Sequence, residues 1–145
     1  MKRFLLIVLV LTGLTLCSCA TMNSSVSLVP PDPNLPEIKA FLGKWEGTWY
    51  DRQYIGSLPA SLVIFRNEQE EITALYSWGG SFDWKVKKGS IIRKPEFYRN
   101  KKREMILYFG KSTLGSNFEF WIDDGNLKGW VVDSATTSVM YRQSL

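Results

Sequence analysis

From Lys44 onward the chain consists of short runs of apolar and aromatic residues, each ended by a turn signal. Between residues 45 and 50, Trp45, Gly47 and Trp49 alternate with more polar neighbours. Asp124-Gly125-Asn126 is the strongest hairpin signal in the chain. Short alternating runs between turns are typical of antiparallel strands. We therefore expect an all-β fold.

The pattern predicts about eight or nine strands. They are expected at residues 45–50, 61–65, 72–78, 82–86, 90–93, 104–109, 117–122, 127–132 and 138–142. Pro95 indicates that the residues after it form an edge strand or a loop. An antiparallel sheet of this size must close on itself or pack as two layers, so we expect a small antiparallel β-barrel over residues 36–145. A short helical turn precedes it, with Pro36 at its first position and Gly43 after its end.

Residues 1–18 have the organisation of a secretory signal. Lys2 and Arg3 precede an almost unbroken apolar run over residues 4–16. This run is too short for an ordinary transmembrane helix. The stretch Leu16-Cys17-Ser18-Cys19 resembles the bacterial lipobox, in which a small residue precedes the cysteine that is lipidated. The resemblance implies a bacterial lipoprotein with Cys19 as lipid attachment site and mature N-terminus. An ordinary signal peptide cleaved near Ala20 is the alternative.

Processing at Cys19 has consequences for the rest of the chain. Only one thiol remains, so no disulfide can form within the mature protein. Residues 19–35, rich in serine and proline, are expected to be a flexible tether. Loss of Lys2 and Arg3 lowers the net charge from +4 to +2, so nucleic-acid binding is not indicated. We expect an exported protein anchored to the membrane of the cell envelope, the outer membrane in a Gram-negative source.

The motif Gly43-Lys44-Trp45 follows the helical turn and opens the first strand. It resembles the Gly-x-Trp motif of lipocalins, in which an arginine of the last strand packs across the tryptophan. Arg142 occupies the matching position here, while the Thr-Asp-Tyr loop signature of lipocalins is missing. The resemblance implies a lipocalin-like (calycin-like) barrel. The spacing of Trp45, Gly47 and Trp49 is also similar to that of small bacterial barrel domains of uncharacterised function.

The chain has no histidine, which excludes Ser–His and Cys–His catalysis and the commonest zinc ligand. The carboxylates of Glu46, Asp83, Glu119 and Asp133 are scattered along predicted strands and their ends, and Glu46 and Glu119 fall on the face where a strand normally meets water. The turn at residues 123–126 lacks the spaced oxygen ligands of a calcium loop. We therefore expect no enzyme activity, no cofactor and no metal site.

Two groups of residues are candidates for binding. The first group is aromatic and is either core packing or the lining of a ligand pocket. It comprises Trp45, Trp49, Trp121 and Trp130, with Arg142. The second group is basic and is either a solvated edge or a surface for an acidic partner or anionic lipid. It comprises Lys85, Lys87, Lys88, Arg99, Lys101, Lys102 and Arg103.

These groups support two hypotheses. In the first, an anchored barrel binds a small lipophilic ligand in its interior. In the second, the barrel is filled by its own side chains, and the protein is a structural or interaction lipoprotein that binds an acidic protein or polymer of the envelope.

Overall fold

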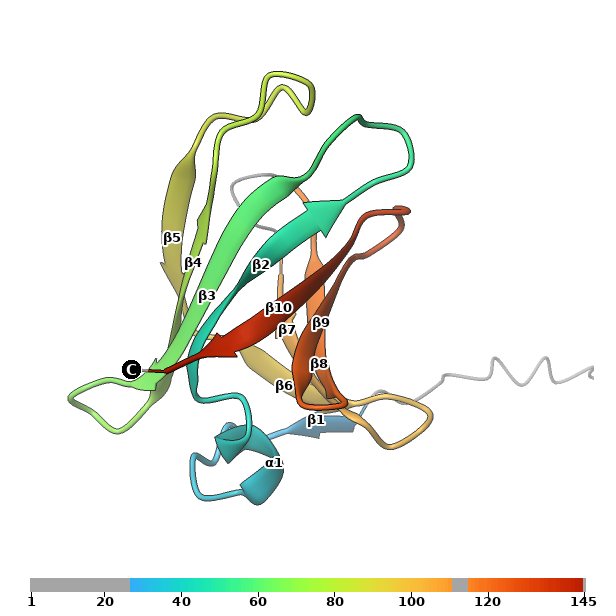
Figure 1. The fold of residues 1–145 in the computed structure, drawn as a ribbon. Coiled ribbons are helices and arrows are strands. Elements are labelled where there is room, and N and C mark those ends of the chain that lie inside the picture. Colours follow the sequence, from blue (N-terminus) through green and yellow to red (C-terminus); the bar gives the residue numbers. More distant parts are fainter. Residues whose placement is uncertain (1–26, 111–114, 145) are drawn as a thin grey trace, which may run out of the picture.

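A computed structural model of the chain describes residues 27–110 and 115–144 (Figure 1). The leader and Cys19 lie outside the described residues. The fold is all-β, a curled antiparallel sheet of ten strands with one short helix. The elements are β1 (Ser27–Val29), α1 (Pro36–Lys39), β2 (Gly43–Tyr50), β3 (Leu58–Arg66), β4 (Ile72–Trp78), β5 (Gly89–Arg93), β6 (Glu96–Arg99), β7 (Met105–Phe109), β8 (Phe118–Asp123), β9 (Asn126–Val131) and β10 (Thr137–Gln143).

The strand order is β1-β6-β7-β8-β9-β10-β2-β3-β4-β5. Strands β2 to β5 and strands β6 to β10 each lie side by side in sequence order, and β10 pairs with β2 to join the two sets. Every pairing is antiparallel, which gives β5 and β6 the same direction. Only Lys94 and Pro95 separate them. The two strands are therefore consecutive parts of one bent path that leaves β4 and joins β7.

Pro95 lies at this bend, between the two hydrogen-bonded ladders, where its missing N–H costs neither strand a bond. The prediction that an edge strand or a loop follows Pro95 is wrong, because β6 pairs with β7 on one side and β1 on the other.

The expected strand at residues 82–86 is also absent. Ser81 and Val86 form an isolated bridge, and the backbone N–H of Lys85 donates to the carbonyl of Phe82 over 3.0 Å. Lys85 has a positive φ of 52°. The alternation of Phe82, Trp84 and Val86 thus belongs to a tight turn between β4 and β5. The other eight predicted strands are present, and β1 and β6 bring the count to ten.

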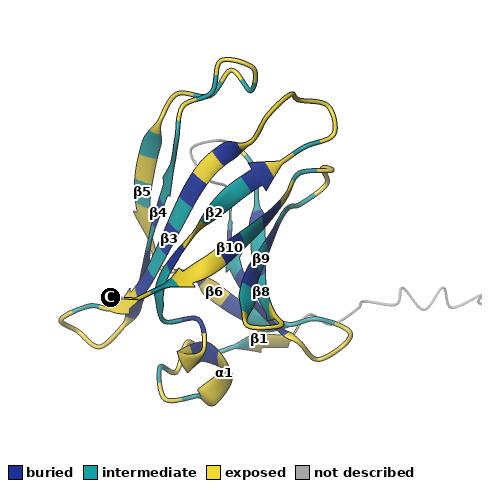
Figure 2. Cartoon of the chain, in the orientation of Figure 1, coloured by how far each residue is buried: buried dark blue, intermediate teal, exposed yellow. Residues whose placement is uncertain are grey.

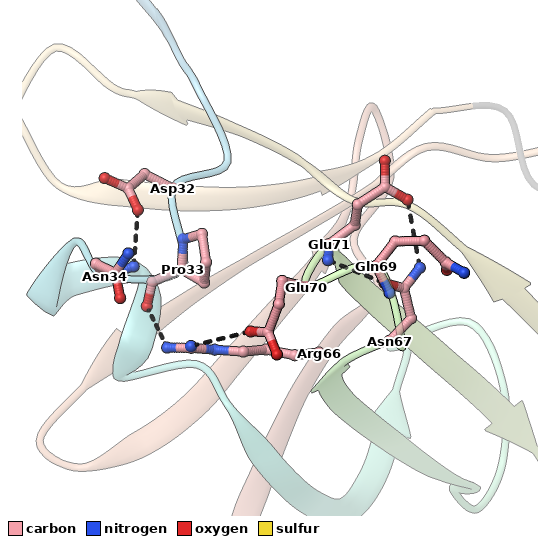
Figure 3. A network of polar contacts seen from close by, with 8 residues as sticks. All are labelled: Asp32, Pro33, Asn34, Arg66, Asn67, Gln69, Glu70 and Glu71. Carbon is pink, nitrogen blue, oxygen red and sulfur yellow. Dashed lines mark hydrogen bonds and ion pairs between the residues drawn. The ribbon is translucent and has the colours of Figure 1, made fainter.

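Of the predicted tether, residues 19–26 lie outside the described residues, and residues 27–35 make defined contacts. Strand β1 pairs with β6 through Leu28 and Tyr98. Further on, the carbonyl of Pro33 accepts a 3.0 Å hydrogen bond from the guanidinium of Arg66, which also contacts the carboxylate of Glu70 at 3.3 Å (Figure 3). Residues 27–35 are therefore held against the end of the sheet that carries α1.

The inner face of the curled sheet forms one core, as the alternation of buried and exposed positions along the strands shows (Figure 2). Its largest fully buried side chains are Trp45, Trp49, Phe41, Phe97, Phe120, Ile38, Leu62, Ile64, Leu107, Leu127 and Met140. Ile38 of α1 and Phe41 belong to this set, so the helical segment covers one end of the interior.

Candidate functional site

Two of the four candidate tryptophans are part of the packed interior. Trp45 is fully buried and its indole N–H donates to the carbonyl of Phe41 over 2.8 Å. The indole N–H of Trp49 donates to the phenol oxygen of Tyr76, also over 2.8 Å. The Trp49 ring packs edge-on against Phe118 and Phe120, with centroids 5.4 and 5.8 Å apart. Side chains of the protein itself therefore surround both rings.

Arg142 lies over the face of Trp45, with its guanidinium carbon 4.2 Å from the ring centroid. The same guanidinium donates to the carbonyls of Leu42 and Ala40, over 2.6 and 2.5 Å. These carbonyls follow α1, so one side chain links the last strand, the first long strand and the helical segment. The geometry is that of a structural closure, because one guanidinium stacks on Trp45 and caps two carbonyls at once.

The other two candidates, Trp121 and Trp130, lie on the outer face of the sheet and remain partly exposed. They line a pocket of about 400 Å³, which we call the outer-face pocket. Strands β6 to β9 contribute Tyr98, Ile106, Glu119, Trp121, Asp123 and Trp130 to it, and the β6–β7 loop contributes Asn100, Lys102 and Glu104.

The hairpin of β8 and β9 positions the two indoles. Asp124 and Gly125 have φ values of 49° and 73°, as the central residues of a two-residue type I′ turn require. This turn sets Trp121 opposite Lys128 and Glu119 opposite Trp130. The two rings are thus diagonal neighbours on one face, a spacing within reach of aromatic side chains.

A carboxylate and a phenol lie between these rings and the β6–β7 loop. The hydroxyl of Tyr98 donates to Oε1 of Glu119 over 2.5 Å. Burial and the adjacent Glu119 carboxylate raise the pKa of Tyr98 above its ordinary value, so the phenol remains a hydrogen-bond donor even in alkaline solution. The carboxylate of Glu119 is thereby held in place by a charge-assisted hydrogen bond.

The remaining polar groups at the rim are also positioned. The indole N–H of Trp130 donates to the carbonyl of Ser134 over 2.8 Å, which fixes the orientation of the ring. The side-chain amide of Asn100 donates to Glu104 over 2.7 Å, and its oxygen accepts from the backbone N–H of Lys102 over 2.9 Å. These bonds shape the loop that carries Lys102 to the pocket.

The structure does not gather the seven basic candidates into one surface. Lys85, Lys87 and Lys88 lie on the β4–β5 loop, at the end of the sheet away from α1 (Figure 1). The β6–β7 loop lies at the α1 end and carries Lys101, Lys102 and Arg103. Arg99 forms a 2.8 Å ion pair with Glu37 and donates to the carbonyl of Arg103. Of the seven, Lys102 alone lines the outer-face pocket.

The sequence interpretation missed Tyr98, and it treated Glu119 as an ordinary solvated residue. Glu119 was recoverable, because a two-residue turn at Asp124 and Gly125 implies its pairing with Trp130. Tyr98 was not, because the residues after Pro95 were expected to form an edge strand or a loop, not a strand paired on both sides.

Within residues 27–110 and 115–144, no three His, Cys, Asp or Glu side chains come together as metal ligands. The same ranges contain no helix with the length and apolarity needed to cross a membrane. No known protein family, curated protein or solved structure matches this chain.

Proposed function

We propose that this chain is a lipid-anchored protein of the bacterial cell envelope that binds a carbohydrate polymer in the outer-face pocket. The observation that carries the proposal is the pair of partly exposed indoles, Trp121 and Trp130, beside the oriented carboxylate of Glu119. The proposed activity is binding, without catalysis.

The chemistry of the pocket suits a chain of sugar rings. An indole offers a flat apolar face that packs against the C–H face of a sugar. Carboxylate oxygens accept hydrogen bonds from sugar hydroxyl groups, and an ammonium group donates hydrogen bonds to the oxygen atoms of those hydroxyls. Glu119, Glu104 and Asp123 supply the acceptors, and Lys102 supplies the donor. A pocket of about 400 Å³ lies within the usual size range for small ligands.

The charges of the outer-face pocket and the packing of the interior bear on the two partners considered from the sequence, an acidic polymer and a small lipophilic ligand. Three carboxylates at the pocket oppose a strongly acidic polymer, because like charges placed together cost binding free energy. A small lipophilic ligand requires space in the interior, where Trp45 and Trp49 are packed and hydrogen-bonded. A hydroxyl-rich polymer on the outer face fits the second hypothesis, with sugar hydroxyls in place of acidic groups.

Two further parts of the proposal come from the sequence resemblances. The lipobox-like stretch ending at Cys19 supports attachment to a membrane by more than one acyl chain, the number that stable anchoring requires. The Gly43-Lys44-Trp45 motif, the Arg142 closure and the pairing of β2 with β10 support a lipocalin-like barrel. Cys19→Ser is expected to abolish palmitate labelling and to release the protein from membranes. Labelling that persists would contradict the anchor.

Binding is tested by co-sedimentation of the full chain, solubilised in detergent, with purified peptidoglycan sacculi. Because aromatic residues at the centre of a binding site contribute about 2 kcal/mol or more, W121A/W130A is expected to weaken binding about 30-fold or more. Tyr141→Ala is the matched control, since Tyr141 is an aromatic residue of the outer face outside the pocket.

A second arm separates sugar recognition from charge. Polyacrylate carries carboxylates without sugar rings, and it is expected to leave sacculus binding unchanged. Absence of binding by the wild-type chain would contradict the proposal. So would full displacement by polyacrylate together with normal binding by W121A/W130A, a combination that favours an acidic partner.

A further inference from the structure

The β2–β3 and β4–β5 loops lie at the end of the sheet opposite α1 (Figure 1), and each of them carries an exposed apolar side chain. Phe82, on the β4–β5 loop, is 96% exposed, and Ile55, on the β2–β3 loop, is 84% exposed. Exposed apolar side chains mark a contact surface where they lie on neighbouring segments, and these two loops contact each other through Tyr54 and Trp84. We call these two loops, residues 51–57 and 79–88, the distal loops.

The distal loops are held together, so that these side chains are presented to solvent from a defined framework. The rings of Tyr54 and Trp84 stack with centroids 5.3 Å apart and planes 29° from parallel. The indole N–H of Trp78 donates to the carbonyl of Lys87 over 2.8 Å. Within the β4–β5 loop, Ser81 and Val86 exchange both backbone hydrogen bonds. Phe82 lies at the tip of this braced turn.

Basic residues lie beside Phe82 on the β4–β5 loop. Lys85, Lys87 and Lys88 are exposed on the β4–β5 loop, which contains Asp83 as its one acidic residue and so has a net charge of +2. In the described part of the chain, none of the three lysines forms an ion pair. A mainly apolar depression lies between Phe82 and Val86, with Lys85 and Lys87 at its sides.

We propose that the distal loops dock on an anionic lipid surface, with Phe82 and Ile55 in the acyl boundary and the lysines among the headgroups. A bare phenyl ring next to several unpaired cations matches both layers of such a surface. A sugar chain offers no apolar layer of this kind, and an acidic protein would leave Phe82 in water unless it also supplied an apolar pocket.

The distal loops lie at the end of the domain away from its N-terminal side, which decides where a lipid surface bound by them would lie. Strand β1, the first described element, pairs with β6 at the opposite end of the sheet, where α1 also lies (Figure 1). The domain therefore has two ends for two lipid surfaces. A membrane that holds the N-terminus lies at the α1 end, and a second, anionic surface meets the distal loops at the other end. The inference is independent of the carbohydrate site, because the two sites share no residue.

The test uses the full chain, inserted through its N-terminal segment into phosphatidylcholine vesicles. Labelled acceptor vesicles of phosphatidylcholine, with or without about one-quarter phosphatidylglycerol, are added, and their capture is measured by flotation. Capture of the anionic acceptors alone is expected, and it should weaken at high salt because surface charges are screened. Equal capture of both acceptor types would overturn the proposal, and so would capture of neither. Association of protein molecules with one another, without capture of vesicles, would also overturn it.

Variants test the two contributions separately. F82S is expected to weaken capture about tenfold or more, the range for burial of a phenyl ring. K85E/K87E is expected to weaken it at least as much, at about fivefold for each cation lost. I92S and K39E/R93E are the matched controls, because they also replace an apolar residue by serine and reverse two positive charges, at exposed positions outside the distal loops. Near-ultraviolet circular dichroism verifies that each variant is folded. Equal capture by F82S, K85E/K87E and wild type would overturn the proposal.

Discussion

The guanidinium of Arg142 covers the indole of Trp45 at 4.2 Å and at the same time holds the carbonyls of Leu42 and Ala40. One side chain near the C-terminus thus joins the last strand to the beginning of the folded domain. The pairing of β2 with β10 brings these residues together, since Arg142 lies opposite Trp45 in the register. Closure of this end therefore depends on contacts between residues about a hundred positions apart, as the separation of Arg142 from Leu42 shows.

Arg142→Lys is expected to lower the free energy of unfolding by about 1–2 kcal/mol. A lysine keeps the charge but cannot donate to two carbonyls while stacking on the ring. Urea unfolding followed by tryptophan fluorescence measures the change. Tyr141→Thr alters the adjacent, 57% exposed residue and should have little effect. Equal urea midpoints for R142K and wild type would mean that the closure is not stabilising.

Tyr76→Phe is expected to cost about 1–3 kcal/mol, because it removes the acceptor of the buried Trp49 N–H. Tyr50→Phe removes a hydroxyl from an exposed ring and serves as the control. A double-mutant cycle with Trp49→Phe isolates the pair, and we expect a coupling free energy of about 1 kcal/mol. Additive effects of the two substitutions would contradict the assigned hydrogen bond.

Gly47→Ala is expected to destabilise the fold by about 3 kcal/mol or more. A Cβ atom at Gly47 would lie 2.1 Å from the carbonyl oxygen of Val139, so β2 and β10 would have to move apart. The same substitution at Gly110 meets no atom closer than 3.6 Å and is the control. Thermal unfolding of both variants compares them, and similar melting temperatures would show that the strands are not this close.

The stability of the protein is expected to fall at alkaline pH. Burial raises the pKa of Tyr76 well above its ordinary value, against a smaller opposing effect of the Trp49 hydrogen bond. The folded state therefore keeps a proton that the unfolded chain loses near pH 10. Stability is complete below about pH 10 and declines as the pH rises further.

The pKa of Tyr98 is also raised in the folded state, so Y76F should remove only part of the loss of stability at alkaline pH. Urea midpoints measured between about pH 8 and pH 11 for Y76F and wild type provide the comparison. Parallel curves for the two proteins would exclude a contribution from Tyr76.

Much of the fold was predictable from local sequence. The run of residues 72–78 has the bounds of β4, and Asp124-Gly125 forms the turn that its composition predicts. The strands that were missed depend on distant partners. β1 contains three residues whose hydrogen bonds are made with β6, about seventy positions away, and β6 follows a proline that a single sequence cannot place at a bend. The turn at residues 82–86 was misread because it mimics strand alternation.

The candidate site was predictable in part. Alternation along residues 117–122 places the side chain of Trp121 on the other face of the strand from Phe118 and Phe120. Trp121 therefore lies outside the core. The abundance of tryptophan suggested that all four candidates serve either core packing or one ligand pocket, yet Trp45 and Trp49 point inward and Trp121 and Trp130 outward. The basic residues were similarly close in sequence but divided in space, because the β5–β6 path carries the chain from one end of the sheet to the other.

The most direct test of the central claim is to measure which indoles a carbohydrate ligand covers. Hydroxyl-radical footprinting with mass spectrometry reports the solvent access of each tryptophan in the full chain. With soluble glycan fragments released from sacculi, we predict protection of Trp121 and Trp130 and no change at Trp45 and Trp49. Protection of neither outer indole by the glycan, or a change at Trp45 and Trp49 on addition of a fatty acid, would contradict a curled sheet with a filled interior that binds carbohydrate on its outer face.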